Sequence, residues 1–106
     1  MGKKRILTLG ERLRALRKEA KLSLKDVADT IGIDNSLLGK IERDERQATR
    51  EQIKQFSLFF KVSEKLLIKE YLSDQIAYKL LEEDADLDTL KVAEAKVSYY
   101  KASRKK

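Results

Sequence analysis

The feature that most constrains this chain lies between residues 24 and 43, where a small residue is followed four positions later by a glycine. Ala28 and Gly32 form this pair, and apolar residues recur on both sides of it at helical spacing. Alanine lets two helices cross closely, and glycine allows the left-handed backbone of a sharp turn. The stretch therefore predicts two short helices joined by about three residues.

Further apolar residues are placed to fill the angle between these two helices. The predicted packing set is Val27, Ala28, Ile31, Gly32, Leu38 and Ile41. An ordinary helical hairpin explains the apolar spacing, but it does not explain the alanine and glycine placed four apart. The pattern is that of a helix-turn-helix.

The composition favours an all-helical domain with a strongly charged surface. The 106 residues include 40% charged and 42% apolar residues, and no proline. This length accommodates one domain with an appended element, and the chain shows no internal repeat or Pro/Gly-rich linker.

The absence of histidine and cysteine argues against catalysis. These two residues supply the commonest general base, the thiolate nucleophile and most transition-metal ligands. We expect no enzymatic activity, no metal or cofactor and no small-molecule ligand. The short apolar runs also predict a cytoplasmic protein that does not enter a membrane.

The net charge of +6 is concentrated at the amino end of the chain. Residues 1–22 contain eight Lys or Arg and two Glu, whereas residues 23–62 hold seven of each sign and residues 63–106 nine of each sign. A basic edge of this kind favours a polyanion such as DNA, although solvated basic termini are also common.

Helix-start signals divide the chain into successive helices. Ser23 with Asp26, and Thr49 with Gln52, have the spacing of capping boxes. Asp34 is expected to cap a helix over 35–43, and Ser63 to cap a later one. That later helix either continues through Ile76 and Leu80 or ends near Ser73. A final helix follows an acidic turn at residues 82–88.

The stretch over residues 9–67 resembles the Cro and lambda-repressor-like (XRE) family of helix-turn-helix regulators. The segments LRALRKEAKLS, GIDNSLLGKIER and KVSEKLL carry this resemblance. It implies an all-α fold with a five-helix lambda-repressor-like DNA-binding domain over 6–72 and a C-terminal helical extension over 73–106. It also implies that the third helix enters the major groove of double-stranded DNA, usually in a homodimer, and that Arg17 and Glu42 form a partly buried ion pair.

The resemblance assigns DNA contacts by position. Base readout falls on Asn35, Ser36, Gly39 and Lys40. Phosphate contacts fall on Ser23, Lys25, Arg43, Arg46 and Arg50. Asparagine suits adenine and lysine can approach guanine, whereas glycine has no side chain and costs a helix roughly 1 kcal/mol relative to alanine. We expect Gly39 to let the helix approach DNA closely. Asn35 could instead cap the helix, and Arg50 could lie in a solvated loop.

Two positions depart from the family pattern. Leu24 stands where the family usually has a glutamine that links a phosphate to the recognition helix. The loop after that helix usually contains glycine, and here it contains Asp44 and Glu45. These carboxylates would weaken DNA binding unless they point away from it or pair with Arg43 and Arg46.

The C-terminal extension carries an apolar stripe at helical spacing, formed by Leu90, Ala93, Val97 and Tyr100. We expect it to pack on a partner subunit. The segments ERQATREQI and KVAEAKVSYYK resemble small XRE proteins found beside restriction-modification or methyltransferase genes. The chain is predicted to be a transcriptional repressor or controller. The alternative is an antitoxin or adaptor whose tail binds another protein.

Overall fold

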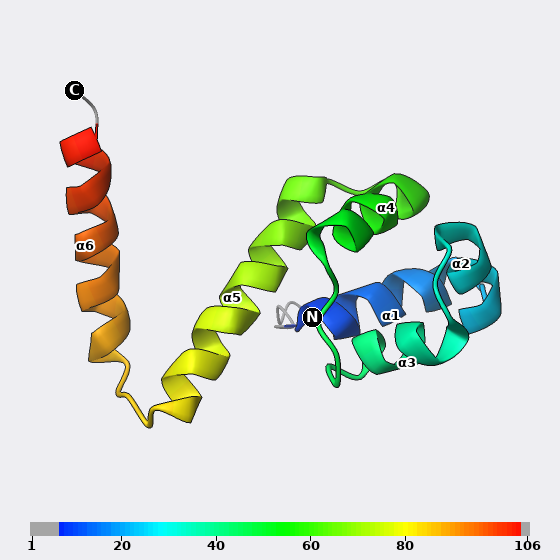
Figure 1. Ribbon diagram of the computed structural model, residues 1–106, viewed down its shortest axis with the longest axis horizontal. Helices are drawn as coiled ribbons and strands as arrows, with labels where there is room; N and C mark the ends of the chain where they lie inside the picture. Colours follow the sequence, from blue (N-terminus) through cyan, green and yellow to red (C-terminus); the bar gives the residue numbers. More distant parts are fainter. Residues whose placement is uncertain (1–6, 105–106) are drawn as a thin grey trace, which may run out of the picture. The chain divides into compact units, whose positions relative to one another are not determined.

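The computed structural model describes residues 7–104, which contain six α-helices and no strand. The helices are α1 (Leu9–Glu19), α2 (Leu24–Ile31), α3 (Asn35–Glu42), α4 (Arg50–Phe60), α5 (Glu64–Glu82) and α6 (Asp88–Arg104) (Figure 1). The all-α fold is as predicted. The first residue of the predicted domain, Ile6, and the basic residues Lys3, Lys4, Arg5, Lys105 and Lys106 lie outside the described residues.

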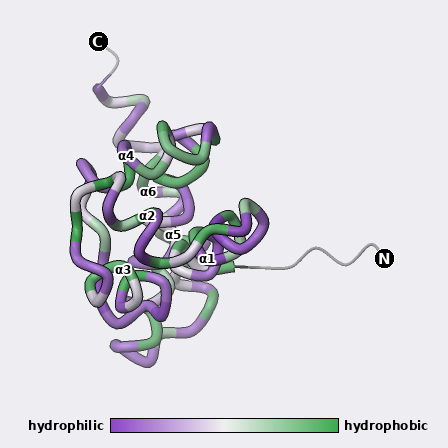
Figure 2. Tube along the Cα trace, turned by 90° about the vertical axis from the view of Figure 1, so that its right-hand side faces the viewer, coloured by the Kyte–Doolittle hydropathy of each residue, from purple (hydrophilic) through white to green (hydrophobic). Residues whose placement is uncertain are grey.

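Helices α1 to α4 and the first part of α5 surround a single apolar core. The buried side chains come from every one of these helices and from the loop before α4: Leu9, Leu13, Val27, Ala28, Ile31, Leu38, Ile41, Ala48, Ile53, Phe56 and Leu67. Apolar and polar residues alternate along the trace of the helices (Figure 2). This alternation lets each short helix turn one face toward the core.

The helix starts follow the local signals in the sequence. Both predicted capping boxes are confirmed, at Ser23 with Asp26 and at Thr49 with Gln52. A third capping box, between Thr8 and Glu11, begins α1. Asp34 is the N-cap residue of α3, as predicted, and has the extended backbone of that position, but its side chain makes no capping hydrogen bond.

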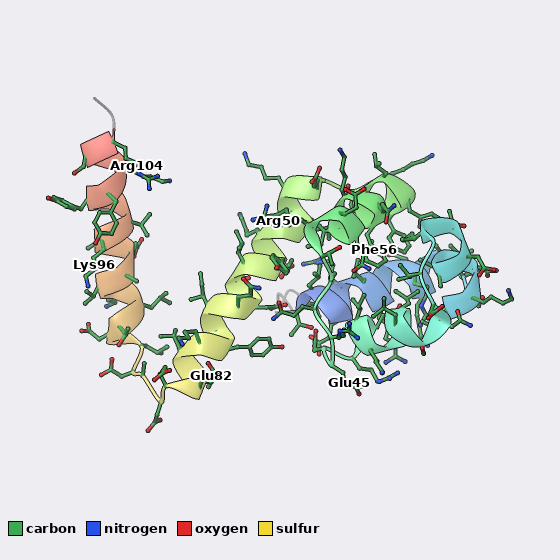
Figure 3. All side chains as sticks on the ribbon, viewed as in Figure 1. Glu45, Arg50, Phe56, Glu82, Lys96 and Arg104 are labelled. Carbon is green, nitrogen blue, oxygen red and sulfur yellow. The ribbon has the colours of Figure 1, made fainter. Side chains whose placement is uncertain are left out.

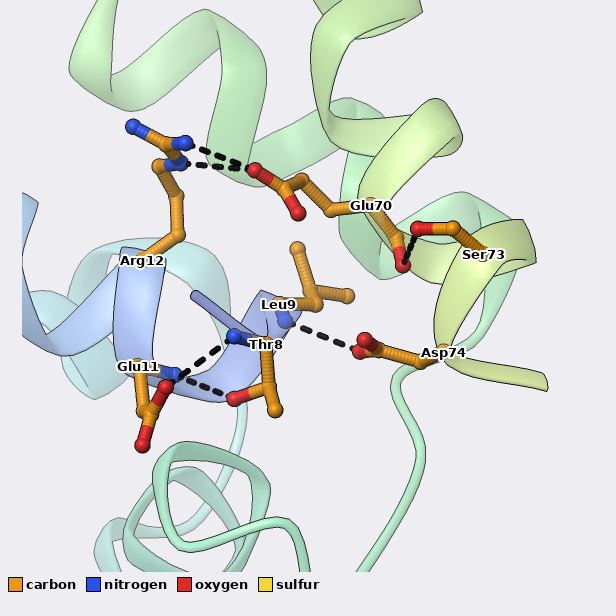
Figure 4. Close-up of polar contacts among 7 residues, drawn as sticks. All are labelled: Thr8, Leu9, Glu11, Arg12, Glu70, Ser73 and Asp74. Carbon is orange, nitrogen blue, oxygen red and sulfur yellow. Dashed lines mark hydrogen bonds and ion pairs between the residues drawn. The ribbon is translucent and has the colours of Figure 1, made fainter. Parts of the chain in front are cut away.

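The amino end of α1 is fastened to α5 within the first compact part of the chain. Arg12 forms an ion pair with Glu70 at 2.7 Å, and the backbone N–H of Leu9 donates to Asp74 at 2.9 Å (Figure 4). These contacts hold together two segments that are about sixty residues apart in the sequence. Bringing such distant segments together carries an entropic cost of loop closure.

The chain divides into two compact units between Asp74 and Gln75, and α5 contains this division. Because α5 continues to Glu82, the prediction that this helix passes Ser73 is the correct one of the two alternatives. The predicted domain boundary between residues 72 and 73 stays a prediction. Every residue of α6 is exposed or only partly covered, with none buried. A membrane span would need a longer apolar stretch than any helix within residues 7–104 provides.

Candidate nucleic-acid interface

The α2–α3 pair has the tight turn that the alanine and glycine predict. Gly32 adopts the left-handed conformation, with φ of 85° and ψ of 37°. Its N–H donates to the Ala28 carbonyl oxygen at 2.8 Å, and the N–H of Ile33 donates to the same oxygen at 3.0 Å. Ala28 is fully buried, as close packing at this position requires. The remaining predicted packing residues, Val27, Ile31, Leu38 and Ile41, are also buried, and Gly32 is exposed at the turn.

An ion pair fixes the other end of α3 to α1. Arg17 Nε lies 2.7 Å from Glu42 Oε2, and Arg17 Nη2 lies 2.9 Å from Glu42 Oε1. The side chains are 11% and 5% exposed, so this bidentate pair is largely shielded from water. The hydrogen bond from Arg17 to Glu42 raises the pKa of Arg17, and Arg17 also donates to the Leu22 carbonyl oxygen. The pair that the resemblance implies is therefore present.

The outward face of α3 presents three of the four predicted base-reading residues. Asn35, Ser36 and Lys40 are exposed, whereas Leu38 and Ile41 are buried. Ser36 and Lys40 are four residues apart and therefore share one helix face. The turn at Gly32 and the Arg17–Glu42 pair hold α3 at both ends, which presents this face rigidly.

Gly39, the fourth predicted base-reading residue, is not exposed on this face. The residue is buried, and the nearest side chain is that of Arg43. A Cβ atom at residue 39 would lie 3.1 Å from Arg43 Nη1. The Arg43 side chain, at the C-terminal end of α3, projects back over the preceding turn, as helical side chains do. Arg43 therefore covers Gly39 in this structure, and the expected close approach of the glycine to DNA stays a prediction.

The predicted phosphate contacts have different surroundings in the structure. Ser23 is the N-cap of α2, and Lys25 lies 2.9 Å from Asp29 in an exposed ion pair. Arg46 is exposed in the loop after α3. Arg50 lies at the start of α4 (Figure 3). Its guanidinium is placed over the ring of Tyr71, 5.9 Å from the ring centroid. This cation–π contact gives Arg50 a partner within its own domain.

The two acidic residues after α3 are both engaged by neighbours. Glu45 accepts hydrogen bonds from Arg43 Nε at 3.0 Å and from Arg43 Nη2 at 3.4 Å. Asp44 accepts a hydrogen bond from the Thr8 hydroxyl at 2.8 Å. The pairing of Glu45 with Arg43 is one of the arrangements considered from the sequence. The Asp44–Thr8 contact was not foreseen, because nothing local in the sequence links residues 36 positions apart.

Gly10 is a second feature that the sequence analysis missed. It is buried in α1, and an added Cβ atom would collide with the carbonyl oxygens of Ile41 and Glu42 at the end of α3. Only glycine allows the two backbones to approach this closely. A glycine inside an otherwise regular, capped helix was the available signal.

The predicted dimerisation residues lie in α6, in the second unit of the chain. Leu90, Val97 and Tyr100 are 43%, 52% and 57% exposed, and Ala93 is exposed as well. Within the described part of the chain, nothing buries this stripe. The same helix also exposes Val92 and Tyr99, so its apolar surface is wider than the predicted stripe.

Comparisons with known proteins agree with this geometry. The helix-turn-helix domain family matches residues 10–73. Among solved structures, a chain of a complex of SinR protein and SinI protein is similar in fold, with a TM-score of 0.55 and 20% sequence identity. The alignment covers 90% of this chain and 99% of that one. No curated protein matches.

These findings confirm the fold class, a lambda-repressor-like helical domain with a C-terminal extension. Helix-turn-helix domains bind DNA through their second helix, so the family supports a DNA-binding regulator. The match extends over more than half of this chain, and the chain therefore belongs to the helix-turn-helix domain family.

Proposed function

We propose that this protein is a sequence-specific DNA-binding transcriptional regulator of the XRE type, which reads the major groove with α3. The observation that carries this proposal is the combination of a polar outer face and a fixed inner face on α3. Asn35, Ser36 and Lys40 are exposed, while Leu38 and Ile41 are buried in the core. A short helix held in this way can insert its outer face into the groove without ordering itself first.

The roles within this face follow from side-chain chemistry. An asparagine amide can pair with N6 and N7 of adenine, and a lysine ammonium can approach O6 and N7 of guanine. Ser36 can donate to or accept from either type of base. Phosphate contacts at Ser23, Lys25, Arg46 and Arg50 would set the register, and Arg50 would have to leave Tyr71 or reach past it.

We further propose that the regulator is a cytoplasmic, non-enzymatic homodimer acting as a repressor or controller. The exposed stripe of α6 supports a second copy as partner, since two copies would cover one another's apolar side chains. The resemblance of its segments to XRE proteins beside restriction-modification or methyltransferase genes suggests such an operon as the target.

One observation favours a second candidate, an adaptor or antitoxin whose tail binds a different protein. A solved structure with a similar fold is a complex of two proteins, SinR and SinI. The uncovered apolar residues of α6 would suit a heterologous partner equally well. In that case α6 would gain protection from hydrogen exchange only when the other protein is added, and the purified chain would be monomeric.

A mobility-shift titration tests the main proposal. The probe is the DNA upstream of the protein's own gene, the competitor is random DNA, and the titration is done at two salt concentrations. We expect a shift that resists the random competitor and weakens as salt increases, because phosphate contacts release counterions. Equal competition by random DNA at low salt would contradict sequence-specific binding.

A further inference from the structure

We propose that Arg43 is a specificity-determining residue that reads a guanine base, and that Gly39 and Glu45 position its guanidinium. This inference rests on the proposed DNA-binding function and assigns to Arg43 a different role from the phosphate contact expected from the sequence. The contacts that carry it are the approach of Arg43 to Gly39 and its two hydrogen bonds to Glu45.

Arg43 is the C-cap residue that follows α3, and it continues the helix face that carries the exposed base-reading candidates. It follows Ser36 by seven residues and Gly39 by four, and both separations bring residues onto one side of a helix. Its side chain returns over Gly39 toward the amino end of α3, which is the end that enters the groove in this class of motif. The guanidinium therefore occupies the surface that a side chain at residue 39 would otherwise fill.

The bareness of Gly39 is what makes this position available. Outside the local backbone of α3, the three heavy atoms nearest to a Cβ atom there would all belong to the Arg43 guanidinium group. A larger side chain at residue 39 would therefore displace the Arg43 guanidinium. Gly39 therefore lowers the stability of α3 but leaves space for the side chain of Arg43, which lies one helical turn later.

Glu45 fixes the orientation of the guanidinium and leaves its other edge unused. Arginine has five N–H donors in a planar group. Glu45 takes the Nε donor and one donor of Nη2, at 3.0 and 3.4 Å. Three donors remain, and the two that Nη1 and Nη2 present along their shared edge have the geometry to pair with O6 and N7 of a guanine.

The charges favour a base over a phosphate as the target. The Arg43 and Glu45 side chains are 58% and 54% exposed, so the pair lies at the surface where DNA would approach. A carboxylate beside the arginine offsets much of its attraction for a phosphate, and it would itself be repelled by the backbone. A base edge carries no net charge, so Glu45 can orient Arg43 there without that repulsion.

The test is a selection of binding sites from random DNA by the full-length wild-type protein and by variants, followed by affinity measurements on the selected site and its single-base changes. Arg43→Ala is compared with Arg46→Ala, a matched arginine in the adjacent loop. We expect Arg43→Ala to lose about 5- to 150-fold of discrimination at one G·C pair, the range for one bidentate contact. Arg46→Ala should keep every base preference and bind all sequences more weakly.

Two further variants test the positioning roles. Glu45→Gln should bind all sequences more tightly but discriminate less at the same G·C pair. Gly39→Leu should lose the preference at that pair in the wild-type background and change nothing there in the Arg43→Ala background, because the residue it displaces is already absent. Circular dichroism melting checks that each variant is folded. Unchanged preferences in Glu45→Gln would overturn the positioning role of Glu45.

The outcomes separate this inference from the function on which it rests. If the wild-type protein selects a site and Arg43→Ala weakens all sequences equally, as Arg46→Ala does, the base-reading role of Arg43 is overturned while DNA recognition stands. If the wild-type protein selects no sequence even at low salt, both proposals fail.

Discussion

Two charged residues of α3, Lys40 and Glu42, lie two positions apart and have opposite environments. Lys40 is exposed, whereas Glu42 is buried and paired with Arg17. Two residues turn a helix by about 200°, so the neighbours face nearly opposite directions. Removing one partner of a buried pair costs about 3–5 kcal/mol, because the other charge is left without compensation. The carboxylate of Glu42 is therefore structural, and the ammonium of Lys40 is available for recognition.

Lys40→Ala should relax base specificity and weaken binding to the preferred site by about 1 to 3 kcal/mol. The reason is that an exposed lysine on the outer face of α3 can contact a base edge without supporting the fold. Affinities on the preferred site and on random DNA provide the measurement. Arg46→Ala is the control, and it should weaken both alike and flatten the salt dependence. Equal losses on both DNAs for Lys40→Ala would contradict its role in base readout.

Asp74 carries a pH dependence of the opposite sign from most carboxylates. Partial burial raises the pKa of Asp74, the hydrogen bond from the Leu9 N–H opposes this, and Asp44, Glu70 and Glu11 raise it further. A raised pKa in the folded state means that folding favours the protonated form. The contribution of Asp74 to stability is therefore complete below its unfolded-state pKa and is lost as pH rises through the folded-state pKa.

Asp74→Asn should accordingly raise the melting temperature at pH 7. The amide oxygen can still accept the hydrogen bond from Leu9, while the negative charge is removed from a site near three other carboxylates. Below the unfolded-state pKa of aspartate the advantage should disappear, because the wild-type side chain is then neutral as well. Melting curves across the acid range provide the measurement. An advantage of the same size at every pH would contradict the electrostatic cause.

The helices show which elements local sequence can define. The starts of α2 and α4 follow from residues three positions apart, and the turn at Gly32 follows from one glycine. These features were predictable because their hydrogen bonds are local. Two other features were not predictable. The burial of Gly39 depends on the path of the Arg43 side chain, and the close approach at Gly10 depends on how α1 packs against α3. The sequence could thus predict which residues form the candidate site, but it could not predict all of the contacts that their side chains make.

The same substitution at two helical glycines should have opposite effects on stability. Gly10→Ala should destabilise the fold by about 1–3 kcal/mol, the usual cost of overpacking, because its Cβ meets backbone oxygens of α3 that cannot move alone. Gly39→Ala should stabilise the fold by up to about 1 kcal/mol, because alanine favours the helix and the Arg43 guanidinium can move aside. Urea unfolding measures both changes. A loss of stability in Gly39→Ala as large as in Gly10→Ala would contradict the difference between a backbone and a side-chain neighbour.

At the scale of the whole molecule, the main feature is the exposed apolar surface of α6. Leu90, Ala93, Val97 and Tyr100 follow one another at spacings of three, four and three, which is the spacing of a coiled-coil seam. Their exposure in a single chain leaves an apolar face that a second copy would bury. A homodimer would also place two copies of α3 for successive half-sites of a two-fold-symmetric operator.

Val97→Glu should convert a dimer into a monomer, because it places a charge in the centre of this seam. Val92→Glu is a matched control, since Val92 is a similarly exposed valine of the same helix that lies outside the stripe. Light scattering after size exclusion gives the mass of each variant. We expect a monomer for Val97→Glu and a dimer for Val92→Glu and the wild-type protein. Val97→Glu should also lose affinity for a two-half-site operator while binding a single half-site as before. A wild-type monomer would contradict the homodimer and favour the heterologous partner, and dissociation by both substitutions would place the interface elsewhere on α6.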